Sequence, residues 1–464
     1  MQPKITLSAL AMVILAMVII ANPFSSLSVL AFLALAFIVV YKIFGEYAIL
    51  ILLLVRPTID VWRDVVLFSY QNFSININAA LAILLLVWSV WFLGKNLQYL
   101  KEVPYKKWWL AFLLWCVITL FWSFDKSSTI IETIKAMDLY ALFATTFVLA
   151  KKYPKKYPEL LHWTLFGSAV VPIIIGIYQF ISKTGMTIDD VPNRIYGTFV
   201  HPNIMATFAL LIFMAIVNRF LHLQRGRPIF KLPKSTMNTI FVQKKYYLIF
   251  ASIILIVVIG ITYTRIAWIG LALFLIILGI LYRPRLLAEI SVIAILGYIT
   301  FFPINNFLID SFNINLQSNS LISRLTTRNK GADSIQWRLD VANKILPLYW
   351  EHPIIGYGYG SFAKVWDENK PIQNIWDNTS EAHNDYLKVL FETGVIGAVL
   401  FLLIFAIMLI RQIRYALKNG WINIVFISSV LVYLALSLSD NMLHHTPVIW
   451  WLWTMWGYWS AENM

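Results

Sequence analysis

The chain has 464 residues, of which 60% are hydrophobic and only 13% are charged. A soluble protein of this length needs far more charged surface, so the composition excludes a soluble globular protein and indicates a membrane protein. The net charge of +14 comes from basic residues that stand between apolar runs, a distribution typical of cytoplasmic loops and not of a nucleic-acid-binding protein.

Apolar runs long enough to cross a hydrocarbon layer as helices follow one another along the chain. The predicted helices are residues 5–21, 27–43, 46–56, 77–94, 107–122, 130–150, 159–181, 203–222, 247–264, 266–282, 287–303, 386–410, 421–439 and 446–460. The first run is interpreted as a retained helix, because no small-residue cleavage site follows it. The sequence therefore predicts an all-α polytopic transmembrane bundle of about 12–14 helices, the lower number applying if run 46–56 does not cross.

Basic residues set the predicted orientation. If the N-terminus is cytoplasmic and every run crosses, more than half of the 37 lysines and arginines fall in inside loops, and the C-terminus is cytoplasmic too. Three polar segments then lie outside: 189–203, the tip around Arg265, and one large, partly helical loop over 304–385. We expect the chemistry on this extracytoplasmic face. The predicted domains are N-terminal helices 1–190, a core 191–410 and C-terminal helices 411–464.

The large loop contains an amphipathic pattern and a glycine-rich turn. Residues 335–350 carry apolar side chains at helical spacing and include Arg338, which predicts a helix lying against the membrane domain. Alternating glycines over 356–360 predict a tight turn of close backbone approach. They do not form a dinucleotide site, because no strand precedes them. Tyr357 and Tyr359 suit stacking on sugar rings, and structural packing is at least as good an interpretation.

The end of the loop carries the candidate base. Ser380 is the predicted N-cap of the next helix, which would put His383 in its first turn. There the helix dipole disfavours an imidazolium, and a neutral imidazole is suited to accept a proton from a hydroxyl. The alternative, an interfacial histidine that only caps or hydrogen-bonds, is equally supported by the residues alone.

Arginines form the second candidate group. An arginine between two apolar helices, such as Arg265, is costly unless it reaches water or a partner, so a functional role is the default hypothesis. Snorkelling at a hairpin tip is the alternative. Because arginine binds phosphate bidentately, Arg265, Arg338 and Arg194 are predicted to hold a pyrophosphate.

Other polar residues carry weaker signals. No outer segment has a metal-binding spacing, so neither a metal nor another cofactor is implied. Glu132, Lys135 and Asp138 have the spacing of a local ion-pair ladder.

Four motifs in the second half resemble the O-antigen ligase and O-antigen polymerase family. They are Arg194-Ile-Tyr-Gly-Thr-Phe-Val-His-Pro-Asn203; Thr262-Tyr-Thr-Arg265; Trp337-Arg338 followed by His352-Pro-Ile-Ile-Gly-Tyr-Gly-Tyr-Gly-Ser-Phe362; and His383-Asn-Asp-Tyr-Leu387 continued by Glu392-Thr-Gly394 and Ile396-Gly397. They occur in the family's order and at suitable spacing, from about Arg194 to about Phe405. One position departs from the pattern, since many relatives carry Asn where this chain has His201.

The resemblance implies a metal-independent, inverting glycosyl transfer in the bacterial cytoplasmic membrane. The implied donor is a glycan on undecaprenyl pyrophosphate, and the implied acceptor is a glycan or glycolipid; membrane lipids are the remaining partners. By motif match, Arg265 and Arg338 would bind the pyrophosphate, and His383 would activate the acceptor hydroxyl. Tyr386, in the same segment as His383, joins Tyr357 and Tyr359 as a candidate glycan contact.

Alternatives remain at two levels. The motifs do not separate a ligase, which transfers the glycan to a lipid core, from a polymerase, which joins repeat units; the histidine segment resembles ligases and favours the first. A transporter of lipid-linked sugars would be expected to show internal repeats or buried acid–base relays, and neither is evident. An envelope scaffold would need no convergence of arginines and histidine.

Overall fold

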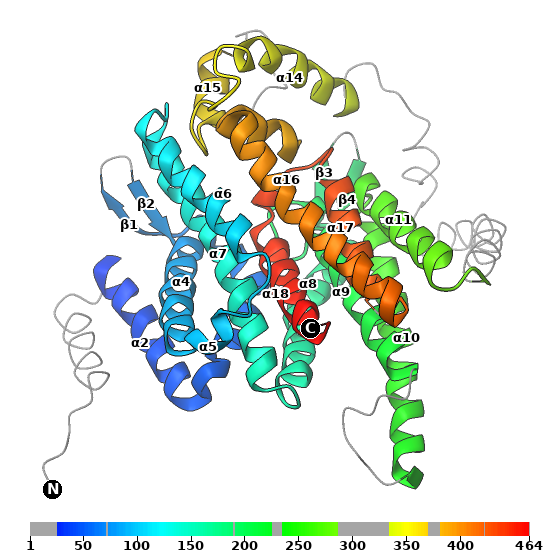
Figure 1. The fold of residues 1–464 in the computed structure, drawn as a ribbon. Helices are drawn as coiled ribbons and strands as arrows, with labels where there is room; N and C mark the ends of the chain where they lie inside the picture. The colour runs from blue at the N-terminus through cyan, green and yellow to red at the C-terminus, as the bar shows by residue number, and fades with distance from the viewer. Residues whose placement is uncertain are drawn as a thin grey trace, which may run out of the picture.

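The computed structural model describes residues 26–70, 73–188, 191–224, 234–285, 334–369, 381–421 and 423–463. Over these residues the chain is a helical bundle with two short β-hairpins, which confirms the predicted all-α polytopic membrane fold (Figure 1). Six helices of this part are long and apolar enough to cross a membrane. The predicted runs 5–21 and 287–303 lie outside the described residues.

The helix bounds follow the apolar runs closely. The α-helices are α2 (Ser26–Phe44), α3 (Ala48–Ile59), α4 (Ile77–Lys95), α5 (Leu97–Leu100), α6 (Lys106–Ile118), α7 (Lys126–Lys152), α8 (Tyr157–Ser182), α9 (Pro202–Gln224), α10 (Lys234–Ile261), α11 (Arg265–Leu281), α14 (Ser334–Tyr349), α15 (Phe362–Asn369), α16 (Asp385–Asn419), α17 (Ile424–Leu436) and α18 (Thr446–Glu462). The antiparallel hairpins are β1 (Val66–Tyr70) with β2 (Phe73–Asn76), and β3 (Met186–Ile188) with β4 (Val191–Arg194).

The last helix, α18, lies in the middle of the bundle and packs against α7, α9 and α3 (Figure 1). Every residue from Pro447 to Ala461 is buried. Tryptophans fill much of this core: the Trp453 ring lies 4.6 Å from that of Trp109 and 4.7 Å from that of Trp456, both edge-on. Large aromatic side chains bury more apolar area per residue than aliphatic ones, so α18 is the packing centre of the bundle.

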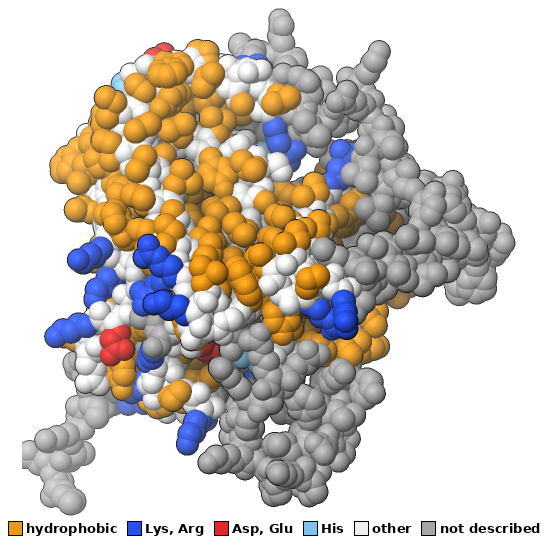
Figure 2. Space-filling view, turned by 45° about the vertical axis from the view of Figure 1, so that its right-hand side comes forward, with side chains coloured by type: hydrophobic (Ala, Val, Ile, Leu, Met, Phe, Trp, Pro, Cys, Tyr) orange, Lys and Arg blue, Asp and Glu red, His pale blue; other side chains and the backbone are white. Residues whose placement is uncertain are grey.

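The bundle has two chemically different ends. At one end Lys152 Nζ bonds Glu46 at 2.7 Å, beside the lysine-rich turn between α7 and α8. Figure 2 shows Lys and Arg side chains gathered mainly below a broad apolar surface. At the other end Arg56 Nη2 donates to Thr446 Oγ1 at 2.5 Å. Glu46 stands just before α3 and Arg56 lies in its last turn, and the candidate membrane span Ala34–Trp62 takes in this helix together with most of α2, so a separate crossing by run 46–56 stays a prediction.

Two further elements position the candidate site. α14 confirms the predicted amphipathic helix and lies beyond the end of α16 (Figure 1). Its inner face packs through Val341, Ile345 and Tyr349 into a second, smaller apolar core that includes Phe391 of α16. The α10–α11 hairpin turns between Ile261 and Arg265, as predicted, and α11 packs against α17 and α9.

Candidate functional site

Arg265 is the first residue of α11, at the tip of the predicted hairpin. Its side chain is half-buried, and its Nε is shielded from solvent without a hydrogen-bond partner among the described residues. The N-terminus of a helix presents unpaired N–H groups and a partial positive charge. Both the guanidinium and the helix end therefore attract an anion, which is the chemistry expected of a pyrophosphate contact.

Arg194, the last residue of β4, is only 3% exposed and is already hydrogen-bonded. Its Nε donates to the Thr262 carbonyl at 3.0 Å, and its Nη2 donates to Thr264 Oγ1 at 3.1 Å. These bonds hold the turn of the hairpin on either side of Tyr263. The contacts therefore favour a positioning role for Arg194 behind Arg265, whereas its predicted direct contact with pyrophosphate remains a prediction.

The helix after the large loop starts later than predicted. Asn384 is the N-cap of α16, and its side chain accepts from the Leu387 N–H at 2.9 Å. The prediction that Ser380 caps this helix and that His383 lies in its first turn is wrong. Asn is among the best N-cap residues, and it stands directly before the helical segment. His383 precedes the cap with a left-handed φ of 46°.

His383 faces a buried carboxylate. Its Nδ1 lies 3.6 Å from Asp440 Oδ1, the separation of an ion pair, and 24% of its side chain is exposed. Burial raises the pKa of Asp440, but His445 and His383 outweigh burial and bring this pKa below its ordinary value. The Nδ1 side of the His383 ring thus faces a carboxylate, an arrangement in which Nε2 is the ring nitrogen left to accept a proton.

A continuous chain of contacts joins the histidine to the arginine hairpin. Asn203 donates from Nδ2 to Asp440 Oδ2 at 3.0 Å. Its Oδ1 accepts from Arg194 Nη2 at 3.3 Å. Arg194 in turn holds Thr262 and Thr264, next to Arg265. Successive contacts thus connect the Arg265 hairpin to His383, and they run through Arg194, Asn203 and Asp440 in that order.

Arg338 reaches the same end of the molecule through α14. It is half-buried, and α14 packs against α16. The apolar core that holds this helix includes Ala382, the residue before His383. The structure therefore brings Arg265, Arg338 and His383 to one end of the bundle, opposite the lysine-rich end.

The three predicted glycan contacts differ in accessibility. Tyr357 is buried, its ring stacks on Phe391 at 4.6 Å, and its hydroxyl donates to the Leu348 carbonyl at 3.0 Å. Tyr359 is buried against Phe112. The contacts of these two side chains therefore support the packing interpretation. Tyr386 is half-buried and donates to the Leu434 carbonyl at 2.6 Å, so its role as a glycan contact stays a prediction.

The glycine-rich turn makes the predicted close backbone approach. Gly356, Gly358 and Gly360 all have positive φ. A Cβ on Gly356 would lie 2.4 Å from the Glu392 carbonyl oxygen, and the Gly358 N–H donates to that carbonyl at 2.8 Å. Only glycine allows this approach, which fixes the turn against α16.

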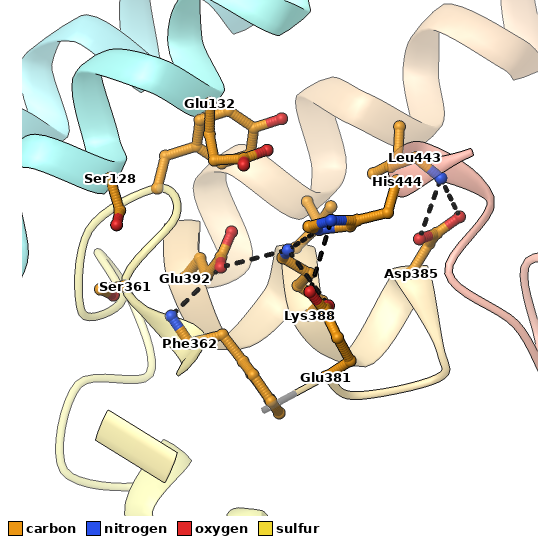
Figure 3. Close-up of polar contacts among 12 residues, drawn as sticks. Ser128, Glu132, Ser361, Phe362, Glu381, Asp385, Lys388, Glu392, Leu443 and His444 are labelled. Carbon is orange, nitrogen blue, oxygen red and sulfur yellow. Dashed lines mark hydrogen bonds and ion pairs between the residues drawn. The ribbon is translucent and has the colours of Figure 1, made fainter. Parts of the chain in front are cut away.

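A second polar cluster was not predicted. Lys388 of α16 is buried and contacts His444, which belongs to the short link between α17 and α18. It also lies 3.7 Å from Glu381 and 4.0 Å from Glu392 (Figure 3). Two signals were present in the sequence: Lys388 and Glu392 stand four residues apart inside an apolar run, and polar residues crowd the link 437–446.

The ladder predicted on α7 is present in part. Lys135 Nζ lies 2.6 Å from Glu132 Oε1. Asp138 is fully buried, and neither of its carboxyl oxygens has a hydrogen-bond partner among the described residues, so it does not extend the ladder. Among those residues no group of three or more His, Cys, Asp or Glu side chains is arranged to hold a metal ion.

Comparison with known proteins gives one family. Residues 250–402, about a third of the chain, match the family model described as O-antigen ligase, which confirms the family resemblance. The matched segment contains Arg265, Arg338 and His383. A search of curated proteins finds no match.

Proposed function

We propose that this protein, a membrane enzyme of the O-antigen ligase or polymerase type with the family's domain over residues 250–402, transfers a glycan from undecaprenyl pyrophosphate to an acceptor hydroxyl. The observation that carries the proposal is the chain of contacts between His383 and the Arg265 hairpin. It supports a base and an anion-binding group held in one rigid arrangement, as a reaction between a hydroxyl and a phosphorylated sugar requires.

In the proposed reaction, His383 Nε2 accepts the proton of the acceptor hydroxyl. The freed oxygen bonds to the anomeric carbon of the donor from the face opposite the pyrophosphate, so the configuration inverts. The bond between that carbon and the pyrophosphate oxygen breaks, and its electron pair leaves with undecaprenyl pyrophosphate. Asp440 stabilises the positive charge that His383 gains, and its contact at 3.6 Å is expected to shorten in the reacting complex.

Charge on the leaving group grows during this step, and the arginines are proposed to bind it. Arg265 and Arg338 supply planar forks of N–H donors that match phosphate oxygens. Donors fixed before the reaction stabilise developing charge without reorganisation. Arg194 is proposed to act through Arg265, because its own bonds hold the hairpin in place.

The site is proposed to face the cell exterior. Lysines and arginines gather at the opposite end of the bundle, around Lys152 and the C-terminal part of α16, and basic loops stay on the cytoplasmic side. Both chain termini are then cytoplasmic, and the enzyme would use donor glycans already on the outer leaflet. We favour ligase over polymerase activity because the His383 segment resembles ligases.

The test is transfer by the purified protein in nanodiscs with an undecaprenyl-pyrophosphate oligosaccharide and EDTA. One arm supplies a lipid A–core glycolipid, and the other supplies only the donor. We expect the wild type to extend lipid A–core and His383→Ala to leave it unextended. The control variant His222→Ala should extend it at the wild-type rate, because His222 lies at the opposite end of the bundle, near Glu462. Lengthening of the donor alone would show a polymerase. No product in either arm, or full activity of His383→Ala, would refute the proposal.

A further inference from the structure

The residues around Lys388 form a cluster that the proposed reaction does not use. We define the Lys388 cluster as Lys388, Glu381, Glu392 and His444. It joins α16 to the loop before it and to the link before α18 (Figure 3). The cluster has a buried inner side, formed by Lys388 and Glu392, and a partly exposed outer side, formed by Glu381 and His444.

The inner side is structural. The Glu392 side chain is fully buried, and its Oε1 accepts from the Phe362 N–H at 3.2 Å. Its backbone carbonyl holds Gly358 of the glycine-rich turn. Glu392 therefore balances Lys388 from within and fastens the turn to α16, and no part of it is exposed to a substrate.

The outer side presents a fixed carboxylate. An ammonium group only donates, so His444 Nε2 must accept from Lys388, and the proton of this imidazole is on Nδ1. Nδ1 lies 3.4 Å from Glu381 Oε1. Burial and the charge of Lys388 lower the pKa of His444 well below its ordinary value, in keeping with a neutral ring. Two side chains thus fix the orientation of Glu381.

Glu381 lies two residues before His383, and both side chains are partly exposed. The residue between them, Ala382, is 1% exposed and points into the core beneath α14. The exposed fraction of the side chain is 33% for its neighbour Glu381 and 24% for its neighbour His383. Glu381 Oε2 is shielded and faces Lys388 at 3.7 Å. A carboxylate oxygen has two lone pairs, so Oε1 keeps one beyond its contact with His444.

We propose that Glu381 is a specificity-determining residue for the acceptor: its Oε1 accepts a hydrogen bond from a sugar hydroxyl neighbouring the one that His383 deprotonates. This inference rests on the proposed function. Hydroxyls are donors, and a carboxylate held by other groups binds them without losing freedom of its own. The acceptor would thus be recognised by two adjacent hydroxyls, one reactive and one held by Glu381.

The experiment is an acceptor titration at saturating donor in nanodiscs, with lipid A–core in one arm and undecaprenyl-pyrophosphate oligosaccharide as acceptor in the other. For Glu381→Gln we expect the acceptor KM to rise at least tenfold, because the hydrogen bond from the sugar hydroxyl to a charged carboxylate becomes a weaker bond to a neutral amide oxygen. The kcat and the donor KM should stay within about twofold of the wild type. The thermal unfolding temperature should stay within a few degrees of it. Glu368→Gln on α15, an exposed carboxylate, is the matched control.

Two variants of His444 sharpen the test. His444→Asn keeps an N–H near the Nδ1 position and should preserve most of the acceptor affinity, whereas His444→Ala should raise the acceptor KM. A merely structural role for Glu381 would instead lower kcat, affinity for both substrates and thermal stability together, and that result would overturn the inference. So would an unchanged acceptor KM in Glu381→Gln while the wild type is active.

Equilibrium binding separates failure of this inference from failure of the proposed function. Binding of lipid A–core and of the undecaprenyl-linked oligosaccharide is measured on His383→Ala and on the double variant with Glu381→Gln. Weaker binding of either acceptor in the double variant would support Glu381 even without turnover. Equal binding of both would overturn its role whatever the activity of the wild type.

Discussion

Asp440→Asn tests the contact chain at its most constrained point. Asp440 Oδ1 faces His383, His445 and the Asn441 N–H, and Oδ2 accepts from Asn203 Nδ2. An amide at position 440 can keep its oxygen toward the N–H of Asn441 only if its NH2 group faces the NH2 group of Asn203. If Asn203 then turns its amide over, it presents donors to Arg194, which has only donors. The substitution therefore leaves an unpaired donor wherever the chain adjusts.

The expected magnitude follows from the bond that is lost. A hydrogen bond to a charged group contributes about 1.5–3 kcal/mol, and removing it from the imidazolium in the transition state should lower kcat about 10–150-fold. The assay is transfer at saturating substrates, with thermal unfolding measured in the same nanodiscs. We expect a fall of a few degrees in the unfolding temperature and no large change in the acceptor KM.

A second substitution, at Asn203, should compensate for the hydrogen bonds that Asp440→Asn loses. Asn203→Asp together with Asp440→Asn restores an acceptor beside Arg194 and a donor between the two positions. The double variant should regain thermal stability but not kcat, because the negative charge has moved away from His383. A kcat for Asp440→Asn within twofold of the wild type, in a preparation where His383→Ala is inactive, would show that Asp440 does not assist His383.

Three further outcomes are expected. A lysine at position 194 cannot make the bonds that Arg194 makes through Nε and Nη2 together. In Arg194→Lys the donor KM should therefore rise about tenfold with little change in the acceptor KM. A rise in the acceptor KM at an unchanged donor KM would show that Arg194 does not act through the donor site. Burial raises the pKa of Glu381, partly offset by Lys388, so this carboxylate takes up a proton at a higher pH than usual. The acceptor KM should therefore rise in the wild type as the pH is lowered toward this raised pKa and stay flat in Glu381→Gln, as substrate titrations at several pH values would show. Asp138→Leu removes a buried carboxyl group without hydrogen-bond partners, so stability should increase by about 1–3 kcal/mol at unchanged transfer rate; a slower transfer would assign Asp138 a role in function.

The helical framework was predictable because apolar runs and their breaks are local features. The run 77–94 became α4 (Ile77–Lys95), and the split at Arg265 became the turn between α10 and α11. The close approach at the glycine-rich turn also followed from local chemistry, since alternating glycines have few other reasons to stand together.

The supporting residues of the site were not predictable in the same way. The hydrogen bond between Asn203 and Asp440 joins residues 237 positions apart, and no local spacing predicts such a pair. Arg194 shows the same limit: its sequence context suits a phosphate ligand, but folding buries it against Thr262 and Thr264. The predicted division into 1–190, 191–410 and 411–464 stays a prediction, and α18 of the last part packs on α7 of the first.

The central place of α18 has a consequence for biogenesis. Asp440 lies in the link between α17 and α18, and α18 fills the middle of the bundle rather than its edge. During synthesis, His383 reaches the membrane well before Asp440 does, so the pair cannot form until the last hairpin has inserted. A nascent chain would thus hold its candidate base without the carboxylate beside it, and the site would become competent only when the whole bundle is assembled.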